Sequence, residues 1–286
     1  MIDLHIHTIC SDGRESPEAM VRYAIELGLE ALAITDHDTV AGIRTAETVA
    51  DGQIRIVPGV ELSATEGDTP IHILGYGIDP DDSRLNVVLA DVVADRRTRA
   101  ERIVAELNDM GLDVTLDMVE HESGEAPITR AHIGYALLNN GYVRNTGEAF
   151  ARYLSNDAPA FVPQTALDIP EAIATIHNAG GIAVYAHPGI TKRDELIARM
   201  VRDGLDGIET IHPQHSRTIT RFYERIARKH GLIMTGGSDA HGRVRMAECI
   251  ASTPVPRNVL SAVDEAVERR NHILRGTLAV DTPSVS

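Results

Sequence analysis

Residues 1–13, MIDLHIHTICSDG, decide the fold of this chain. Apolar and polar side chains alternate from residue 2 to residue 6, which is the period of two expected of a buried β-strand. The alternation places His5 and His7 on the same face, with imidazoles close enough to share one metal ion. Asp12 follows on the loop. The first strand therefore predicts part of a metal site, and the remaining ligands must come from elsewhere in the chain.

The composition indicates an ordered globular protein. With 286 residues, 43% of them hydrophobic, the chain can form one large domain or one domain with an insertion. No stretch approaches the roughly 18 apolar residues of a membrane span, and no basic and apolar leader is present at the N-terminus. Two cysteines without a disulfide framework favour a reducing, cytoplasmic location.

The formal charge of −15 bears on the class of ligand. Three divalent cations in one pocket would offset part of this charge and make that pocket locally positive. A globally acidic protein with a positive pocket suits a small phosphorylated substrate better than a long nucleic acid, whose backbone requires an extended basic surface. The sequence indicates no membrane association and no obligate protein partner.

Helical and strand-like segments alternate along two parts of the chain. Predicted strands cover residues 29–35, 54–57, 71–76, 182–186, 204–211 and 232–235, and predicted helices cover 18–27, 40–50, 169–177, 218–229 and 259–269. This βα rhythm is typical of a parallel sheet wrapped by helices. The chemistry of such folds lies at the carboxyl ends of the strands, and the polar residues of this chain fall at those ends.

The rhythm changes between the two parts. We predict a helical insertion or cap over residues 81–163, lodged in a β/α barrel formed by residues 1–80 and 164–286. Four arginines of the insertion have two open interpretations: they form a solvated helix face that pairs with nearby acidic residues, or some of them reach over the pocket to bind phosphate. They are Arg96, Arg97, Arg99 and Arg102. Arg130 and His132 begin another helix, where an anion site is expected.

Nine ligand-type residues lie at successive predicted strand ends. They are His5, His7, Asp12, His37, Glu61, His72, His187, Asp239 and His241. A single histidine after a strand is more often a satisfied polar group than a ligand, but nine such residues by chance are improbable. Imidazole and carboxylate together suit Zn, Mn or Fe(II). Nine ligands are too many for one ion and about the right number for three, with positions left for water and substrate.

These residues resemble the motif series of the polymerase-and-histidinol-phosphatase (PHP) superfamily, in its order, over about residues 1–242 apart from the insertion. The motifs are His5-Ile-His7, Ser11-Asp12-Gly13, Thr35-Asp36-His37, Gly59-Val-Glu61, His72, Ala186-His187-Pro188 and Ser238-Asp239-Ala-His241. The resemblance implies a distorted seven-stranded β/α barrel that binds two or three divalent metal ions.

By the same resemblance, the ligands divide into three sets. They are His5, His7, Glu61 and Asp239 for one ion, a bridging Glu61 with His72 and His187 for a second, and Asp12, His37 and His241 for a third. Histidinol-phosphate phosphatases of the superfamily usually have a histidine where this chain has Asp12. That departure and the insertion resemble the subgroup that acts on nucleotides. Its features imply phosphate contacts for Arg130, His132 and His215.

The hypothesis is a metal-dependent phosphoesterase that hydrolyses phosphate monoesters of small nucleotide-like substrates, such as the 3′-phosphate of nucleoside 3′,5′-bisphosphates. A hydroxide that bridges the two ions sharing Glu61 would attack phosphorus, and His215 is the candidate acid for the leaving oxygen. Three alternatives stay open: a 5′→3′ exonuclease on short RNA or DNA, a hydrolase of cyclic phosphodiesters and their monoesters, and a non-catalytic metal-binding PHP module.

Overall fold

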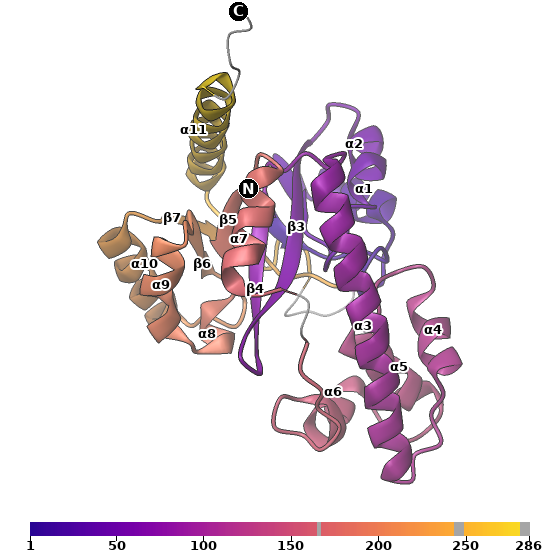
Figure 1. Cartoon of the computed structure of the whole chain (residues 1–286). Helices are drawn as coiled ribbons and strands as arrows, with labels where there is room; N and C mark the ends of the chain where they lie inside the picture. Colours follow the sequence, from indigo (N-terminus) through magenta and orange to yellow (C-terminus); the bar gives the residue numbers. More distant parts are fainter. Residues whose placement is uncertain (165–166, 243–248, 281–286) are drawn as a thin grey trace, which may run out of the picture.

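The computed structural model describes residues 1–164, 167–242 and 249–280, with residues 273–280 as backbone only. One seven-stranded sheet runs through it in chain order (Figure 1). Its strands are β1 (Ile2–Ile6), β2 (Ala31–Ile34), β3 (Arg55–Glu66), β4 (Thr69–Tyr76), β5 (Ile182–Tyr185), β6 (Gly207–Ile211) and β7 (Ile233–Gly236). A bridge between Ile6 and Ala240 brings the two edges of the sheet together. The predicted seven-stranded α/β barrel is therefore confirmed.

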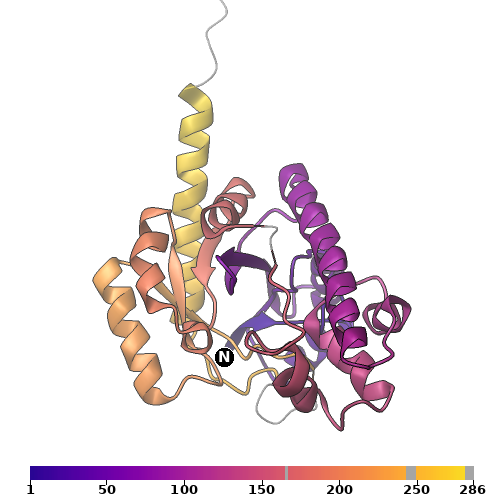
Figure 2. The same cartoon turned by 60° about the horizontal axis from the view of Figure 1, so that its bottom comes forward.

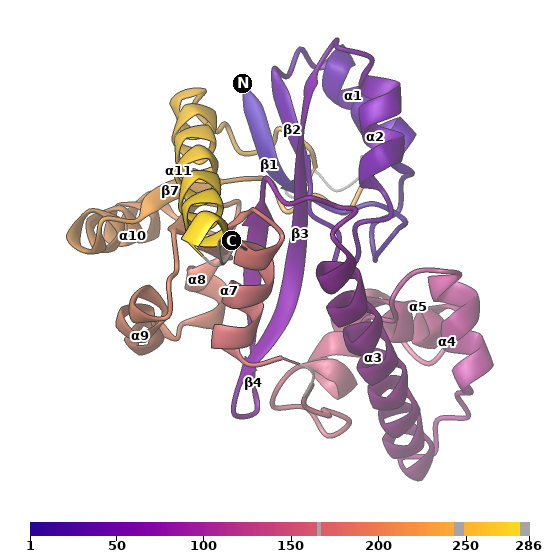
Figure 3. The same cartoon turned by 45° about the horizontal axis from the view of Figure 1, so that its top comes forward.

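The sheet is not parallel throughout, and here the sequence interpretation was wrong. β4 runs antiparallel to both β3 and β5, while the other neighbouring strands are parallel. The reason is local, because only Gly67 and Asp68 separate β3 from β4, and so short a connection permits only a hairpin. Figure 3 shows this long hairpin beside the shorter strands.

Helices cover the outer face of the sheet. In the barrel they are α1 (Pro17–Glu26), α2 (Ile43–Ala50), α7 (Ile169–Asn178), α8 (Pro188–Thr191), the 3-10 helix η2 (Asp194–Leu196), α9 (Ile197–Arg202), α10 (Arg217–His230) and α11 (Asn258–Val280). Their starts follow from side-chain caps. Ser16 accepts a hydrogen bond from the Ala19 N–H at the start of α1, and Asp168 does the same for the Glu171 N–H at α7.

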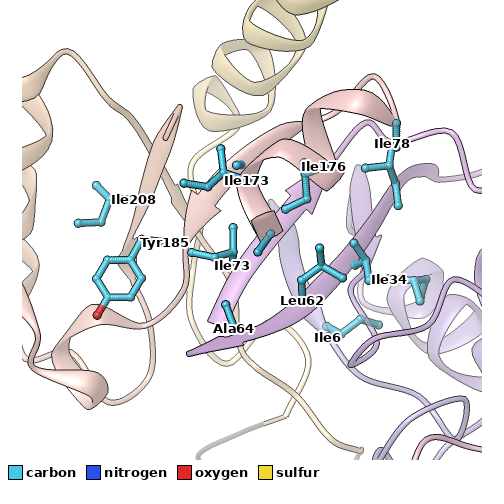
Figure 4. Packing of buried hydrophobic residues seen from close by; sticks show 14 of the residues in the cluster. Ile6, Ile34, Leu62, Ala64, Ile73, Ile78, Ile173, Ile176, Tyr185 and Ile208 are labelled. Atoms are coloured by element: carbon cyan, nitrogen blue, oxygen red, sulfur yellow. The ribbon is translucent and has the colours of Figure 1, made fainter. Parts of the chain in front are cut away.

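The main core lies between the sheet and these helices. Ile173 and Ile176 of α7 pack over Leu62 of β3 and Ile73 of β4 (Figure 4). A second cluster forms where α11 lies against the amino-terminal ends of the strands, and it includes Val259 and Val263. This arrangement closes one end of the barrel with apolar side chains and leaves the carboxyl ends of the parallel strands for polar ones.

A helical lobe connects β4 to α7 and lies beside the barrel, opposite α10 (Figure 2). It contains α3 (Ser83–Asp109), α4 (Leu116–Ser123), α5 (Arg130–Asn139), α6 (Thr146–Ala149) and the π-helical turn η1 (Phe150–Leu154). Its apolar side chains, among them Leu107, Leu137 and Leu154, form a cluster of their own. The boundaries 81–163 of this insertion stay a prediction. None of the described helices is long and apolar enough to cross a membrane.

Candidate metal centre

The predicted ligands come from seven places in the fold and meet near the carboxyl ends of the parallel strands. His5 lies on β1 and His7 follows it, Asp12 and His37 lie on the loops after β1 and β2, His187 follows β5, and Asp239 and His241 follow β7. Glu61 and His72 differ from the expectation, because they lie inside the β3–β4 hairpin rather than at strand ends. Strand β3 continues past Pro58 because Val60, Leu62 and Ala64 keep the alternating apolar face that packs on the core.

Four ligand atoms form the first group. His5 Nε2 lies 3.3 Å from Glu61 Oε2 and 3.4 Å from Asp239 Oδ1. His7 Nε2 lies 3.2 Å from the same glutamate oxygen and 3.1 Å from the same aspartate oxygen. Four ligands at the usual bond lengths around a tetrahedral zinc ion are separated by roughly 3.3–3.6 Å. The spacing of these four atoms therefore fits a single ion between them.

Glu61 connects this group to a second one. Its Oε2 atom faces His5 and His7 and also lies 3.2 Å from His37 Nδ1. Its Oε1 atom lies 2.9 Å from His72 Nδ1 and 2.8 Å from His187 Nε2. A carboxylate whose two oxygens face different sets of nitrogens can hold one ion with each oxygen. The bridging position that the resemblance implies for Glu61 is therefore available in the structure.

The third group contains Asp12, His37 and His241. His241 Nε2 lies 3.3 Å from Asp12 Oδ1, and His37 Nε2 lies 3.9 Å from Asp12 Oδ2. The Nδ1 atom of His241 lies 2.9 Å from the Asp239 carbonyl oxygen and therefore carries the proton of the neutral ring. The lone pair of Nε2 is then available to a metal ion. His7 is near this group too, but a neutral imidazole offers one lone pair, and Nε2 of His7 already faces the first group.

Two properties of the site fit divalent cations. Several buried ligand atoms have no hydrogen-bond partner in the described structure: both ring nitrogens of His7, Nδ1 of His37, Nδ1 of His187 and Oδ1 of Asp12. Burial disfavours the ionised carboxylates, but neighbouring histidines outweigh it and hold the pKa values of Asp12, Glu61 and Asp239 well below their usual range. Unpaired imidazole nitrogens beside ionised carboxylates are the donor set of Zn, Mn or Fe(II) sites.

Two aspartates that flank His37 hold the surrounding loops. Asp36 accepts hydrogen bonds from the Thr8 N–H at 2.7 Å, the Thr8 hydroxyl at 2.7 Å and the Ser11 hydroxyl at 2.6 Å. These bonds order the loop that presents Asp12. Asp38 accepts from the Ser63 N–H at 2.7 Å and fixes the turn after β2 against β3.

The backbone is strained where it presents ligands. Of the described non-glycine residues with positive φ, three lie at this site: His187 at 28°, Asp38 at 52° and Asp239 at 51°. Such conformations cost about 1–3 kcal/mol each and persist only where the surroundings enforce them. Their concentration here is typical of a functional site.

Glu209 is a site residue that the sequence interpretation missed. It is fully buried on β6, and its Oε1 atom accepts a hydrogen bond from His5 Nδ1 at 3.0 Å, while Oε2 accepts from the His187 N–H at 2.8 Å. A carboxylate behind a ligand histidine fixes its tautomer and orientation. Glu209 therefore directs Nε2 of His5 toward Glu61 and Asp239.

A cavity of about 160 Å³ adjoins the centre on the side of the helical lobe. Asp12, His37 and His72 line its metal side, and Arg96, Arg99 and Arg130 line the side of the lobe. The interpretation of these helix arginines as a solvated face is wrong for Arg96 and Arg99, which are both buried. It holds for Arg97, which is exposed and pairs with Glu101 and Glu120.

The three cavity arginines differ in how fully they are bonded. Arg96 has three protein partners: Asp38 Oδ2 at 2.6 Å, Ser63 Oγ at 2.8 Å and the Ile128 carbonyl at 3.1 Å. Among the residues that the structure describes, Arg99 donates only its Nε–H, to the Val162 carbonyl at 2.6 Å. Burial and the charges of Arg130 and Arg96 lower the pKa of Arg99 to about 9, so it stays charged near neutral pH. Arg96 therefore clamps the lobe to the barrel, and Arg99 keeps donors for an anion.

The predicted substrate contacts Arg130 and His132 have different surroundings. Arg130 Nη1 donates to the Leu154 carbonyl and to Asn156 Oδ1, both at 2.9 Å, and its guanidinium lines the cavity. The ring of His132 accepts a hydrogen bond from the Thr129 N–H at 3.0 Å and thereby caps α5. His132 does not belong to the described cavity lining. The structure thus brings Arg130 to the site and gives His132 a structural partner.

Backbone groups occupy both ring nitrogens of His215. Nδ1 lies 3.0 Å from the Thr210 carbonyl, and Nε2 accepts from the Gly189 N–H at 3.1 Å. These partners fix the neutral tautomer with the proton on Nδ1, and burial lowers the pKa of the ring. A ring held in this way has no proton to offer a leaving group, so the geometry argues against our prediction of His215 as the acid.

Known proteins that are similar to this chain support the interpretation of these residues as a metal centre. The sequence profile of the PHP domain matches residues 3–155. The chain is 36% identical over 245 residues to a 5′-3′ exoribonuclease of Haemophilus influenzae, covering 84% of this chain and 89% of the relative. It is 33% identical over 249 residues to a 3′,5′-nucleoside bisphosphate phosphatase of Chromobacterium violaceum, covering 84% and 87%.

The fold is similar to that of a protein from Bifidobacterium adolescentis assigned as a metal-dependent phosphoesterase. The two structures have a TM-score of 0.84 at 31% sequence identity, over 93% of this chain and 96% of that one. The domain match, the relatives and the ligand geometry agree. The chain belongs to the PHP family and is a metal-dependent phosphoesterase.

Proposed function

We propose that the protein hydrolyses a phosphate monoester of a nucleotide that carries a second phosphate, such as the 3′-phosphate of a nucleoside 3′,5′-bisphosphate. The observation that carries this proposal is the cavity between the metal ligands and the lobe. The reacting phosphate would lie beside Asp12, His37 and His72, and the second phosphate would meet Arg99 and Arg130 across the same cavity.

Cavity size and charge support this class of substrate. A volume of about 160 Å³ is below the roughly 300–1,000 Å³ of pockets that enclose a whole ligand. It suits phosphate-sized groups, and the nucleoside would extend outward. Gln164 adds a buried Nε2 amide without a hydrogen-bond partner in the described structure. Guanidinium and amide donors facing one small cavity are the arrangement expected of an anion site.

Two or three divalent ions of Mn, Zn or Fe would be held by the three ligand groups. When bound, such ions lower the pKa of water and neutralise charge that develops on the phosphate. The chain itself supplies orientation, because Glu209 and Asp36 hold the ligands in place and the arginines would align the second phosphate. Binding energy from a phosphate that does not react can position the reacting one.

A second candidate is a 5′→3′ exonuclease on short RNA. The exoribonuclease relative favours it, and so does the small cavity, which would leave the remainder of an oligonucleotide outside. The chemistry at the metal centre would be the same, with a phosphodiester in place of the monoester.

The test is phosphate release with Mn(II) supplied, comparing adenosine 3′,5′-bisphosphate with adenosine 3′-monophosphate and adenosine 5′-monophosphate. A 5′-phosphorylated trinucleotide and a 1,2-cyclic ribose phosphate complete the panel. We expect kcat/KM for the bisphosphate to exceed that for either monophosphate by about 100-fold, since each charged hydrogen bond to the second phosphate contributes about 1.5–3 kcal/mol. Equal values for the bisphosphate and the 3′-monophosphate would contradict the proposal.

A further inference from the structure

A second cavity, of about 520 Å³, lies on the other side of the metal centre, between α8 and α10. Its apolar floor includes Ile219, Phe222 and Tyr223, and Lys192, Arg221 and Arg225 carry the positive charges of its lining. Phe222 is 37% exposed.

Basic side chains are concentrated in and beside this cavity, although the protein as a whole is acidic. Arg217, Arg221 and Arg225 follow one another at intervals of four residues and therefore lie on one face of α10. Within the described part of the chain, neither these arginines nor Lys192 have an ion-pair partner. Asp194 is the one acidic residue of the lining, and it accepts a hydrogen bond from the Tyr223 hydroxyl at 2.8 Å. The surface therefore carries a net positive charge although the whole chain has a formal charge of −15.

The cavity and the metal centre share a wall. Gly189 lines the cavity and lies two residues after His187, whose Nε2 is 2.8 Å from Glu61 Oε1. On the same wall, His215 accepts the Gly189 N–H and packs against Tyr223, with ring centroids 5.5 Å apart. α10 begins at Arg217 directly after this wall, so its row of arginines leads away from the centre.

We propose that this cavity docks the downstream part of a single-stranded RNA whose 5′ end lies in the metal centre. The inference rests on the second candidate of the proposed function, the 5′→3′ exonuclease, and names the surface that would hold the rest of its substrate. The Phe222 ring is partly exposed, and the Arg225 guanidinium carbon lies 5.9 Å from its centroid, so a base could stack on the ring beside this cation. The arginines without an ion-pair partner and Lys192 offer charges for successive phosphates. Exposed aromatics interleaved with cations are the usual means of holding single strands without reading their sequence.

The experiment measures binding of a 5′-phosphorylated RNA of about eight nucleotides, labelled with fluorescein at its 3′ end, by anisotropy over a range of salt concentrations. The protein is loaded with Ca(II) in place of Mn(II) to prevent turnover. The variants are R221A and F222A, with R102A as the matched control, because Arg102 is an exposed arginine on α3 of the helical lobe and does not line the cavity between α8 and α10.

We expect R221A to bind roughly tenfold more weakly and to show a shallower salt dependence, since it removes one phosphate contact. F222A should also bind roughly tenfold more weakly but keep the salt dependence of the wild type, because it removes stacking and no charge. R102A should bind like the wild type. Wild-type binding by both cavity variants, or an equal loss in R102A, would overturn the proposal.

Turnover separates this inference from the proposed function. With Mn(II), both cavity variants should hydrolyse adenosine 3′,5′-bisphosphate within about twofold of the wild-type rate and lose kcat/KM only on the oligonucleotide. Equal losses on both substrates would overturn the docking role. Failure of the wild type to hydrolyse any substrate would contradict the proposed function instead, and the binding measurement would still decide the role of the cavity.

Discussion

Glu209 Oε1 accepts a hydrogen bond from His5 Nδ1 at 3.0 Å, in a part of the barrel from which water is excluded. The bond fixes the proton of His5 on Nδ1 and leaves the lone pair of Nε2 for the metal centre. The other carboxylate oxygen of Glu209, Oε2, accepts a hydrogen bond from the His187 N–H at 2.8 Å. A single carboxylate thus positions ligands of two of the three groups, which makes Glu209 a positioning residue for those two groups.

Replacing Glu209 with Gln should weaken metal binding by about 10–100-fold, because the amide no longer favours one tautomer of His5. Metal content after dialysis, measured by elemental analysis, and activity against Mn(II) concentration check this. For a positioning residue, activity should recover toward the wild-type value at saturating Mn(II). Unchanged metal affinity, or a loss of activity that Mn(II) does not restore, would contradict the role of Glu209 in positioning the metal ligands.

Replacing Arg99 with Met should raise KM for adenosine 3′,5′-bisphosphate by about 10–100-fold, since the buried guanidinium offers its free donors to the second phosphate. KM for adenosine 3′-monophosphate should change little, which separates lost recognition from a general disturbance of the lobe. The matched control is Arg97→Met on the same helix, where the arginine is exposed and paired with glutamates. An equal rise of KM for both substrates would argue against phosphate recognition by Arg99.

Replacing His215 with Gln should leave the alkaline limb of the pH–rate profile in place, because backbone groups already hold both ring nitrogens. The expected effect is structural: a melting temperature lower by a few degrees, corresponding to about 1 kcal/mol for the lost hydrogen bonds. Loss of the alkaline limb in this variant would restore His215 as the acid.

Replacing Asp206 with Asn should lower the free energy of unfolding by about 1–3 kcal/mol near neutral pH. The carboxylate is bonded to His177 Nε2 at 2.7 Å, the Ala183 N–H at 2.9 Å and Arg270 Nη2 at 2.8 Å. Burial disfavours its ionised form, but these hydrogen bonds outweigh burial and hold the pKa of Asp206 below its usual value.

The sign of the pH dependence follows from that shift. Because the folded state binds the proton less tightly than the unfolded state, the contribution of Asp206 is fully present above the unfolded pKa of about 3.9. It is lost as the pH falls through the lower pKa of the folded state. Urea denaturation of both proteins should therefore show a constant difference down to about pH 5 and a shrinking one below about pH 4. A difference that grows on acidification would contradict this role.

The sequence predicted those parts of the site that depend on local pattern. His5 at the end of β1 and His7 just after it lie two residues apart, and Asp239 and His241 repeat that spacing after the last strand, so each pair is visible without knowledge of the fold. Glu209 was not visible, because an isolated glutamate in a short strand does not indicate which buried histidine it will face. The βα rhythm also did not predict that β3 and β4 form an antiparallel hairpin, although the short turn at Gly67 could have indicated it.

The arginines of α3 show a second limit. Arg96, Arg97 and Arg99 lie within four residues on one helix, and the sequence does not tell which face of a long helix meets the barrel. Only the packing of the lobe separates the buried pair from the exposed Arg97. Contacts between segments distant in sequence, such as Arg96 with Asp38, are set by tertiary structure and leave no local pattern.

The most direct test of a metal-dependent centre organised by Glu61 is phosphate release from adenosine 3′,5′-bisphosphate during titration of the chelator-treated protein with Mn(II), with metal content measured on the same samples. Wild-type protein should release no phosphate without metal and should gain activity as Mn(II) fills the sites. Glu61→Gln should bind less metal and stay inactive over the whole titration, because its amide cannot serve two ions as the carboxylate does. Phosphate release by metal-free wild-type protein, or full activity of Glu61→Gln at normal metal content, would contradict the central claim.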